Sequence, residues 1–520
     1  MNAADTIARA PTGVTAFVGR TLKGPVNEPV RIASFAQYEH VFGGLWQPSM
    51  LSYAVEQFFE NGGRAALIVR VASGARPSTL SLPAGGGVLS LIGVNPGSRE
   101  YLRAAVDYDG IRADDPGTFN LVLQRVRQPG SELIEDQEIF RKLSIDPGAS
   151  RYVEEALLTS RLMRVSGAVP PWRPDRTGGD ARAGYVGANA DGDDGAALVD
   201  YDLIGSAAGH TGIFALRSPF DFDLLCLPAL SRDHDVGLST LTVAARFCRD
   251  RQAILLVDPP SDWTSVDAAL SGMREWPFRS ENAAMYFPRV EARDRLRART
   301  AVFGSAACAA GIIARGDETW PVWAATESED AVLRHGMRPA VSLSEADRAR
   351  LAHAGINSLH AVRPSVPASI SPRTLAVGTP AAASWRYLAA RRLALFILSS
   401  VERGTRWLQT QHNGPVAWDA AQRQVTEFLD GLDREGAFAG SSPGESYFAI
   451  CDERVNGRAA LALGQVNILF GVALERPGDF HNCMVTHQPS GSRVRPVTVN
   501  RQLTSPDRVE WEIETAVLRG

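Results

Sequence analysis

The order of apolar segments near the N-terminus is the strongest constraint on the fold. Residues 14–18 (VTAFV) predict a strand, and residues 50–59 (MLSYAVEQFF) carry apolar side chains at helical spacing. The apolar positions of this helix are Leu51, Ala54, Val55, Phe58 and Phe59. The NGG triplet at 61–63 ends the helix, because Asn and Gly tolerate positive φ, and residues 65–71 (AALIVRV) follow as a second strand. Residues 1–75 therefore predict a compact β-α-β unit.

A second alternating block follows in the middle of the chain. Its predicted strands are residues 222–230 (FDLLCLPAL), 253–260 (AILLVDPP) and 283–290 (AAMYFPRV). Predicted helices lie at 242–250 (TVAARFCRD) and within 301–317 (AVFGSAACAAGIIARGD). Short apolar strands separated by helices indicate a sheet that is covered on its faces.

The composition changes between these two blocks. Residues 76–195 are rich in Gly, Pro, Asp and Arg, and they contain a hairpin-like segment at 118–130 (TFNLVLQRVRQPG). This pattern predicts an inserted, mostly β domain with a flexible exit at about 166–197.

The last third of the chain has the most regular pattern. Residues 383–409 predict one long helix, and residues 416–432 place an apolar stripe on a second helix. The stripe consists of Trp418, Ala421, Val425, Phe428 and Leu432. Predicted strands follow at 446–452, 465–474 and 480–487, and the tail has an extended pattern at 493–499 and 508–518.

These patterns predict a mixed α/β chain. Within it, the inserted mostly β domain is expected at 76–195 and an α/β middle domain at 196–375.

Composition excludes several function classes. The 520 residues are 45% hydrophobic and carry a net charge of −4, so no basic excess indicates nucleic acid as a direct partner. The longest apolar run, LALFIL at 393–398, is far too short to cross a bilayer, so no membrane insertion is expected, and the N-terminus has no apolar region typical of a signal peptide. The cysteines are scattered without a CxxC pair, which predicts buried free thiols and assembly in the cytoplasm: Cys226, Cys248, Cys308, Cys451 and Cys483.

One motif suggests an enzyme. Residues 440–444 (GSSPG) form a literal G-x-S-x-G, and Asp479 with His481 or His487 follows Ser442 in the order of an α/β-hydrolase triad. A nucleophile elbow requires a strand, a sharp turn and then a helix, whereas here a helix comes before the motif and a strand after it. Pro443 also lacks the backbone N–H that an oxyanion hole would use. The motif therefore favours a turn, and a hydrolase using Ser442 remains the alternative.

The phosphate and metal motifs are weaker. The glycines at 13–24 are not followed by the Lys-Ser/Thr of a P-loop, so this segment favours a turn. Residues 189–200 (NADGDDGAALVD) have Asp194 where a calcium loop needs Gly and Asp200 where it needs Glu. No HExxH motif occurs. The sequence therefore predicts no cofactor, no metal and no enzyme activity, which favours a structural role.

Several segments resemble those of contractile tail sheath proteins, which occur in phage tails and in related injection systems. The resemblance begins with PTGVTAFVGRTLKGPVNEPVRIASFAQYEHVFGG (11–44) and LSYAVEQFFENGGRAALIVRV (51–71). It resumes over 192–376, from GDDGAALVDYDLIG (192–205) through FDLLCLPAL (222–230), AILLVDPP (253–260) and AAMYFPRV (283–290) to AGIIARGDETWPVWAATES (310–328), LAHAGINSLHAVRP (351–364) and SPRTLA (371–376). It is found again at WRYLAARRLALFILSSVERGTRW (385–407) and at GQVNILFGVALERPGDFHNCMVTHQ (464–488). About three-fifths of the chain is covered, and residues 76–195 are not.

The resemblance implies a structural subunit that polymerises as stacked six-fold rings around an inner tube. Contraction of such a sheath drives the tube through a target envelope without nucleotide hydrolysis. The implied partners are further copies of the chain, the inner tube protein, and baseplate and terminal cap proteins. A static shell or scaffold protein with the same fold is a further alternative.

The resemblance also implies a discontinuous core domain, with an N-terminal arm at 1–20, a first core part at 21–75, a second core part at 376–487 and a C-terminal arm at 488–520, and it implies that the inserted domain at 76–195 faces outward. Neighbouring subunits are then expected to exchange strands from the flexible arms. The candidates for this exchange are Val14, Thr15, Ala16, Phe17, Val18, Arg495, Val497, Thr498 and Val499. For the inner tube contact, the candidates are three arginines of the long helix, Arg386, Arg391 and Arg392.

Overall fold

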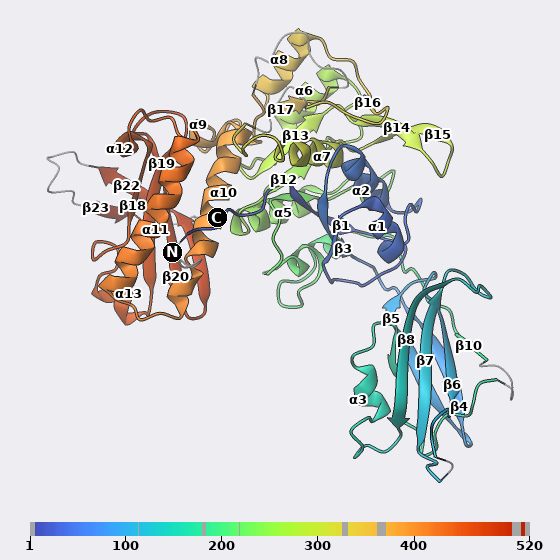
Figure 1. Ribbon diagram of the computed structural model, residues 1–520. Coiled ribbons are helices and arrows are strands. Elements are labelled where there is room, and N and C mark those ends of the chain that lie inside the picture. The colour runs from blue at the N-terminus through green and yellow to red at the C-terminus, as the bar shows by residue number, and fades with distance from the viewer. Residues whose placement is uncertain are drawn as a thin grey trace.

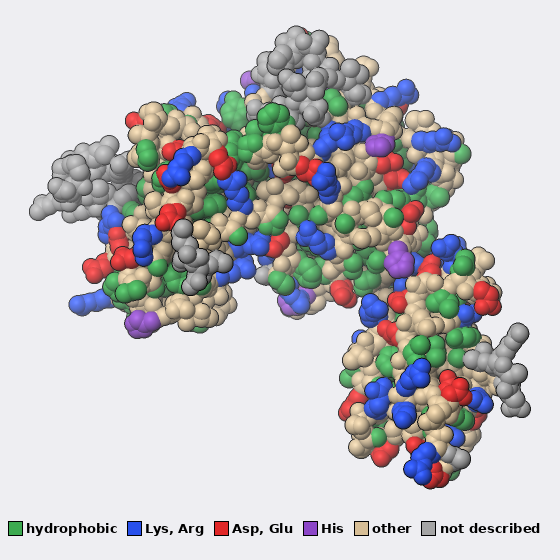
Figure 2. Space-filling model, viewed as in Figure 1, with side chains coloured by type: hydrophobic (Ala, Val, Ile, Leu, Met, Phe, Trp, Pro, Cys, Tyr) green, Lys and Arg blue, Asp and Glu red, His purple; other side chains and the backbone are tan. Residues whose placement is uncertain are grey.

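The protein consists of three lobes (Figure 1). The computed structural model describes residues 6–112, 114–178, 184–217, 219–324, 331–360, 371–501 and 511–514. A central α/β lobe joins a β-rich lobe on one side and a C-terminal lobe on the other. Basic and acidic side chains are interspersed over all three lobes on the face shown in Figure 2.

A seven-stranded sheet forms the central lobe. In spatial order its strands are β17 (Ile356–Ser358), β13 (Ala283–Phe287), β12 (Ile254–Val257), β11 (Leu224–Cys226), β1 (Val14–Gly19), β3 (Ala65–Arg70) and β2 (Val30–Ile32). All neighbouring pairs are parallel except β2 with β3. The strands expected from the apolar runs are thus confirmed, although β13 ends at Phe287 rather than at 290, and β11 and β12 also end earlier than expected. Pro228 and Pro259 lie just beyond them, where a proline has no N–H for a sheet hydrogen bond.

Helices cover both faces of this sheet (Figure 1). One face packs on α1 (Phe35–Phe42), α2 (Met50–Glu60) and α7 (Ala306–Gly316). The other packs on α4 (Asp200–Ile204), the 3₁₀ helix η1 (Gly212–Ala215), α5 (Leu238–Asp250), α6 (Val266–Glu275) and α8 (Glu345–His353). Phe17 belongs to the first core, and Ala16 and Val18 to the second, so successive residues of β1 are buried on opposite faces.

A hairpin extends from the central lobe. It consists of β14 (Val290–Asp294) and β15 (Arg299–Phe303), and the two-residue strand β16 (Arg338–Pro339) pairs with the outer side of β14.

The β-rich lobe is inserted between β3 and β11 and has a core of its own. One sheet contains β4 (Pro77–Ala84), β5 (Gly87–Pro96) and β9 (Met163–Val165); the other contains β10 (Val186–Gly187), β6 (Tyr101–Asp107), β7 (Thr118–Val126) and β8 (Ile134–Ser144). A short helix, α3 (Val153–Leu157), precedes β9. The two chain connections to the central lobe run side by side, with a bridge between Ser73 and Ala196.

Polar contacts fix the β-rich lobe to the central lobe. Lys23 Nζ lies 2.5 Å from a carboxylate oxygen of Glu135, and the lysine side chain is 6% exposed. Asp194 accepts hydrogen bonds from the backbone N–H and the hydroxyl of Ser98 at 2.7 and 2.6 Å. Arg20 donates to the carbonyl oxygen of Asp194. The acidic turn compared above with a calcium loop therefore forms part of this joint.

The C-terminal lobe combines helices with a four-stranded antiparallel sheet. Its helices are α9 (Ala382–Trp385), α10 (Leu388–Gly404), the 3₁₀ helix η3 (Arg406–Gln409), α11 (Pro415–Arg434), α12 (Pro443–Ser446) and α13 (Arg458–Ala462). In spatial order the strands are β18 (Tyr447–Ile450), β19 (Val466–Ala473), β20 (Phe480–Gln488) and β21 (Gly491–Pro496). Beyond them, β22 (Thr498–Arg501) pairs with β23 (Trp511–Glu514).

The prediction of one continuous helix at 383–409 is wrong, because the structure divides this region into α9, α10 and η3. Tyr387 is extended between α9 and α10. The reason is that Arg386 and Leu388 form backbone hydrogen bonds with the segment at 372–374 instead of continuing the helix. The helix expected at 416–432 is confirmed by α11, in which Trp418, Ala421, Val425 and Leu432 are buried and Phe428 packs against the core: all lie on the predicted stripe.

The strand at 14–18 is confirmed, but its assignment to an exchanged N-terminal arm is wrong. Thr15, Ala16 and Phe17 pair with β11 on one side, and Val14 to Val18 pair with β3 on the other. Both edges of the strand are therefore occupied within the same chain, at the centre of the sheet. Residues 1–5 of the expected arm lie outside the described residues.

The C-terminal arm is also shorter than expected. Arg495 lies in β21 and pairs with Met484 of β20 in the same chain. Val497 is 6% exposed and packs in the small core of the four-stranded sheet. Thr498 and Val499 lie in β22, opposite Glu514 and Ile513. Residues 502–510 and 515–520 lie outside the described residues.

Candidate functional site

Helix α10 lies across the amino-terminal edge of the central sheet. Its Arg392 contacts Asp223, which directly precedes β11, and its Arg391 contacts Asn282, which directly precedes β13. The N-terminal segment enters β1 at the same edge. The junction of the central and C-terminal lobes is therefore built from the starts of parallel strands and from the arginines of one helix.

The centre of this junction is a buried ion cluster. Arg392 donates to both carboxylate oxygens of Asp317 at 2.9 and 2.5 Å, and to Asp223 at 3.1 Å. The side chains of Arg392 and Asp317 are 2% and 3% exposed. Asp317 follows the last residue of α7, so the guanidinium also lies near the negative end of that helix dipole. Burial alone lowers the pKa of Arg392, but the charges of both carboxylates outweigh it and hold the pKa above its usual value.

Asp223 connects the cluster to the central strand. Its second oxygen accepts a hydrogen bond from the backbone N–H of Val14 at 2.8 Å. Burial raises the pKa of Asp223 to about 6, although Arg392 acts in the opposite direction. The ionised form is thus held in place by one cation and one backbone donor.

Arg391 forms a second contact across the junction. It donates to the side-chain oxygen of Asn282 at 2.6 Å, and Asn282 in turn donates to the carbonyl oxygen of Ala253, which precedes β12. Its guanidinium lies 4.4 Å from the ring centre of Trp385. Burial lowers the pKa of Arg391 to about 10.

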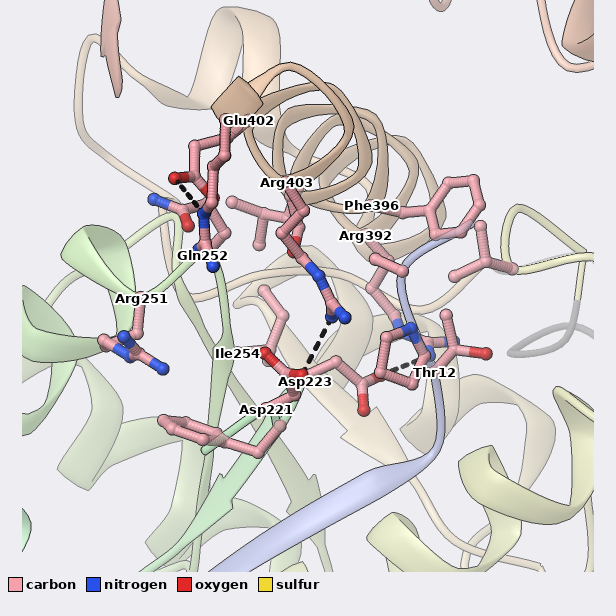
Figure 3. A pocket seen from close by; sticks show the side chains of 17 residues that line it. Thr12, Asp221, Asp223, Arg251, Gln252, Ile254, Arg392, Phe396, Glu402 and Arg403 are labelled. Carbon is pink, nitrogen blue, oxygen red and sulfur yellow. Dashed lines mark hydrogen bonds and ion pairs between the residues drawn. The ribbon is translucent and has the colours of Figure 1, made fainter. Parts of the chain in front are cut away.

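A small pocket of about 50 Å³ opens beside the ion cluster (Figure 3). Arg403 reaches across it to Asp221 at 3.0 Å, and Arg406 forms two hydrogen bonds with Glu402 at 2.8 and 2.7 Å. Arg403 and Asp221 have side chains that are 34% and 40% exposed, so this pair is more weakly held than the buried one.

The N-terminal segment crosses the junction before it enters the sheet. The N–H of Ala10 donates to the hydroxyl of Ser400 on α10 at 2.9 Å. Ile7 packs so closely on α10 that a Cβ at Gly404 would lie 2.8 Å from its side chain. Arg9 pairs with Glu435 just beyond α11. These contacts are made with the same chain that carries the segment.

Two of the three arginines expected to contact the inner tube are buried, so the prediction is wrong for these two. Arg391 and Arg392 are 8% and 3% exposed and serve the lobe junction, so their charge is not available at the surface. Arg386 is exposed. The acidic partners Asp223 and Asp317 were missed from sequence, although Asp223 lies directly before a buried apolar strand, where a charge needs a partner.

The hydrolase residues do not form a catalytic site. Ser442 is exposed and precedes the four-residue helix α12, with no strand leading into the turn. His487 is 1% exposed, and its two ring nitrogens bond the hydroxyls of Thr405 and Ser492, both at 2.8 Å. His481 packs against Trp385, with ring centres 4.4 Å apart. Among the described residues, no hydrogen bond links Ser442 to either histidine or to Asp479.

Only one tautomer of His487 matches the donors and acceptors of its hydrogen-bond partners. Thr405 donates its hydroxyl proton to the carbonyl oxygen of Val401, so it accepts from Nε2–H of His487. Ser492 accepts from Gln409 and therefore donates to Nδ1. Burial lowers the pKa of His487 to about 4. This neutral histidine joins the end of α10 to the edge strand β21.

The four-stranded sheet has open edges within the described residues. β18 pairs with β19 alone, and β21 pairs with β20 alone. Each leaves a row of backbone N–H and C=O groups without a strand partner on its outer side. Among the described residues, there is no group of three or more His, Cys, Asp or Glu side chains placed to hold a metal ion, and no helix with the length and hydrophobicity needed to cross a bilayer.

Solved structures share this fold over nearly the whole chain. The sheath of an extracellular contractile injection system, PVC, in the contracted state matches with a TM-score of 0.51 and 14% identity, over 91% of each chain. A sheath tail protein from Listeria innocua, Lin1278, matches with a TM-score of 0.56 and 12% identity, over 94% of this chain and 97% of that chain. The contracted helical sheath of the anti-feeding prophage matches with a TM-score of 0.50 and 16% identity, over 92% of this chain and 94% of that chain.

The sequence itself matches no protein-family model and no curated protein. The comparisons therefore establish the fold, which is that of contractile sheath subunits, and they confirm at this level the resemblance found in the sequence.

Proposed function

We propose that this protein is the subunit of a contractile sheath, which polymerises as stacked six-fold rings around an inner tube and shortens to drive the tube through a target envelope. The observation that carries this proposal is the length of the structural match: 91% or more of this chain and of each solved sheath subunit described above. A match limited to the α/β sheet would support only a common fold, because such sheets serve many functions.

The lobe junction supports a mechanical role. The central and C-terminal lobes share a continuous hydrophobic core, and the ion pair of Arg392 with Asp317 adds a buried contact between them. A subunit that moves by sliding past its neighbours needs such internal rigidity, because strain would otherwise be absorbed inside the subunit. In this proposal the movement takes place in the connections between subunits.

The open sheet edges support assembly by strand addition. An added strand from another copy would supply the hydrogen-bond partners that β18 and β21 lack on their outer sides. The segment available for donation begins after Val497, where the chain leaves the four-stranded sheet and enters β22. Thr498 and Val499 remain candidates for this exchange, as do residues 1–5.

The other partners are proposed from the same role. Arg386 remains the candidate for contact with the inner tube, since it is exposed in the short connection between α9 and α10. Baseplate and terminal cap proteins would bind the two ends of the polymer. The buried free thiols of all five cysteines support assembly in the reducing cytoplasm.

Electron microscopy of the purified full-length chain tests the proposal. We expect hollow cylinders with six-fold symmetry, and two distinct lengths per ring when the extended and contracted forms are compared. Cylinders of a single fixed geometry under all conditions would instead identify a static shell. Ser442→Ala should leave the cylinders unchanged; a monodisperse monomer whose hydrolytic activity disappears in this variant would overturn the proposal in favour of a hydrolase.

A further inference from the structure

The central sheet has a change of winding direction between β1 and β11. From β1 the chain passes through α2 to β3 on one side, and it later continues from β11 through α5 to β12 on the other side. In open α/β sheets the crevice beyond the carboxyl ends of the strands at such a point is the usual ligand position. The feature is independent of the lobe junction, which lies at the opposite edge of the sheet.

A cavity occupies this position. Its volume is about 200 Å³, which is more than ten times the roughly 10–15 Å³ that one water molecule requires. Met50 and Ala54 of α2 form one wall, Cys226 and Pro228 at the end of β11 form another, and Phe303 of the β14–β15 hairpin lies over it. Apolar and polar groups line the cavity in similar proportion, so a ligand would meet both an apolar wall and hydrogen-bonding groups.

Two arginines supply hydrogen-bond donors to the cavity. Arg289 donates through Nε to the carbonyl oxygen of Pro259 and through Nη2 to Asp235. Arg232 donates through Nη2 to Asp294 at 2.5 Å, while its Nε is buried without a hydrogen-bond partner among the described residues. A guanidinium has five N–H groups, so both side chains keep donors beyond those that position them. Since each arginine is anchored by one aspartate, its orientation is fixed before any ligand binds.

One carboxylate supplies an acceptor. Asp258 follows β12 and accepts a hydrogen bond from the N–H of Ala306 at 2.8 Å through Oδ1. Its Oδ2 lies against Gly304, where a Cβ would come within 2.2 Å of it. Burial raises the pKa of Asp258, and Arg289 opposes this. The cavity thus combines guanidinium donors with a single carboxylate acceptor.

We propose that this cavity binds inorganic phosphate, a small oxyanion that keeps a proton at neutral pH. The unprotonated oxygens would accept from Arg232 and Arg289, and a P–OH group would donate to Asp258. Near neutral pH inorganic phosphate carries at least one proton, whereas a phosphate monoester, with a second pKa of about 6, is mostly unprotonated and sulfate carries no proton. Sulfate oxygens and the carboxylate of Asp258 are both hydrogen-bond acceptors, so no hydrogen bond can form between them. We therefore expect the cavity not to bind sulfate.

Isothermal titration calorimetry of the full chain with inorganic phosphate and with sulfate, at matched ionic strength and pH 7, tests this site. We expect binding of phosphate and none of sulfate. Ala54→Leu fills the cavity without changing a charge and should abolish phosphate binding, while Arg289→Gln should weaken it by about tenfold or more. Arg454→Gln removes an equal charge from an exposed pair in the C-terminal lobe and should have no effect.

Asp258→Asn provides the sharpest measurement. An amide can donate to an oxyanion, so this variant should bind sulfate and phosphate with similar affinity. Equal binding of both anions by the unaltered protein, no phosphate binding at all, or phosphate binding that survives Ala54→Leu would each overturn the proposal. The result is independent of polymerisation, since the titration uses the dissociated subunit and a failed sheath assay would leave it unaffected.

Discussion

Arg392 and Asp317 share two hydrogen bonds, at 2.9 and 2.5 Å, although their side chains are only 2% and 3% exposed. The arginine belongs to the C-terminal lobe and the aspartate to the end of a helix that covers the central sheet. Two charges removed from water this completely are stable only as a pair. The relation therefore couples the folding of one lobe to the correct docking of the other.

Arg392→Met should be strongly destabilising, because it leaves Asp317 and Asp223 buried without their cation. We expect the free energy of unfolding at pH 7.5 to fall by about 3–5 kcal/mol in urea titrations. The loss should shrink at pH 5, because burial raises the pKa of Asp223 to about 6 and this carboxyl group can then take up a proton. Arg403→Gln is the matched control: its partner Asp221 is partly exposed, and we expect a loss of about 1 kcal/mol or less. Equal losses in the two variants would contradict the assignment.

His487 should make the C-terminal lobe sensitive to acid. Its pKa is about 4 in the folded state against 6.5 unfolded, so the unfolded chain binds the proton first. Stability is therefore lost as the pH falls from 6.5 towards 4, by about 2–3 kcal/mol at pH 4.5. Glu402 and Arg406 are the charged groups that act on this ring, and they oppose each other. His487→Gln should lose this component in urea titrations at pH 7 and 4.5; an unchanged slope would contradict the prediction.

Replacing each of two helical glycines by alanine should change the free energy of unfolding, and the two changes should have opposite signs. A Cβ at Gly311 of α7 would lie 2.5 Å from the carbonyl oxygen of Phe58, so Gly311→Ala should force α7 away from α2 and cost about 1–3 kcal/mol. At Gly431 of α11 no atom lies within 4 Å of such a Cβ, so Gly431→Ala should stabilise by up to about 1 kcal/mol. Thermal unfolding of the two variants measures both; a stabilised Gly311→Ala would show that the helices can separate freely.

Deleting residues 498–520 should block polymer formation and leave a folded monomer, because the four-stranded sheet is complete at β21. Sedimentation together with circular dichroism would distinguish a loss of assembly from a loss of fold. A longer deletion from residue 489 also removes β21 and exposes the edge of β20, and it should aggregate. Normal cylinders from the 498–520 deletion would exclude a role of this tail in assembly.

Local elements could largely be predicted from sequence, whereas their partners could not. The run VTAFV at 14–18 predicts a strand correctly, and its unbroken hydrophobicity is itself a signal for a central position, since an edge strand would alternate. The exchange of arms implied by the family resemblance led instead to the wrong location. Spatial order depends on which strands meet, and no periodicity within a single strand contains that information.

The ion cluster, like the strand order, could not be predicted from sequence, because its members are distant from one another along the chain. Arg392 lies 75 residues from Asp317 and 169 residues from Asp223 in sequence, so no local spacing connects them. Two adjacent arginines within the otherwise apolar stretch 388–398 favour a surface contact when only that helix is considered. Their burial follows from the position of α10 across the sheet edge, which is a tertiary property. In the same way, the cavity at the switch point becomes visible only when β1 is known to lie beside β11.

The central position of β1 has a consequence during synthesis on the ribosome. β1 can pair with β3 early, but its other neighbour begins at Leu224, after the whole β-rich lobe. At ~5–20 residues per second, the roughly 150 residues between them keep one edge of β1 unpaired for about 10–30 s. The nascent chain therefore passes through an interval in which a strand that is fully buried in the folded protein is open to wrong partners, and a chaperone acting in that interval would protect it.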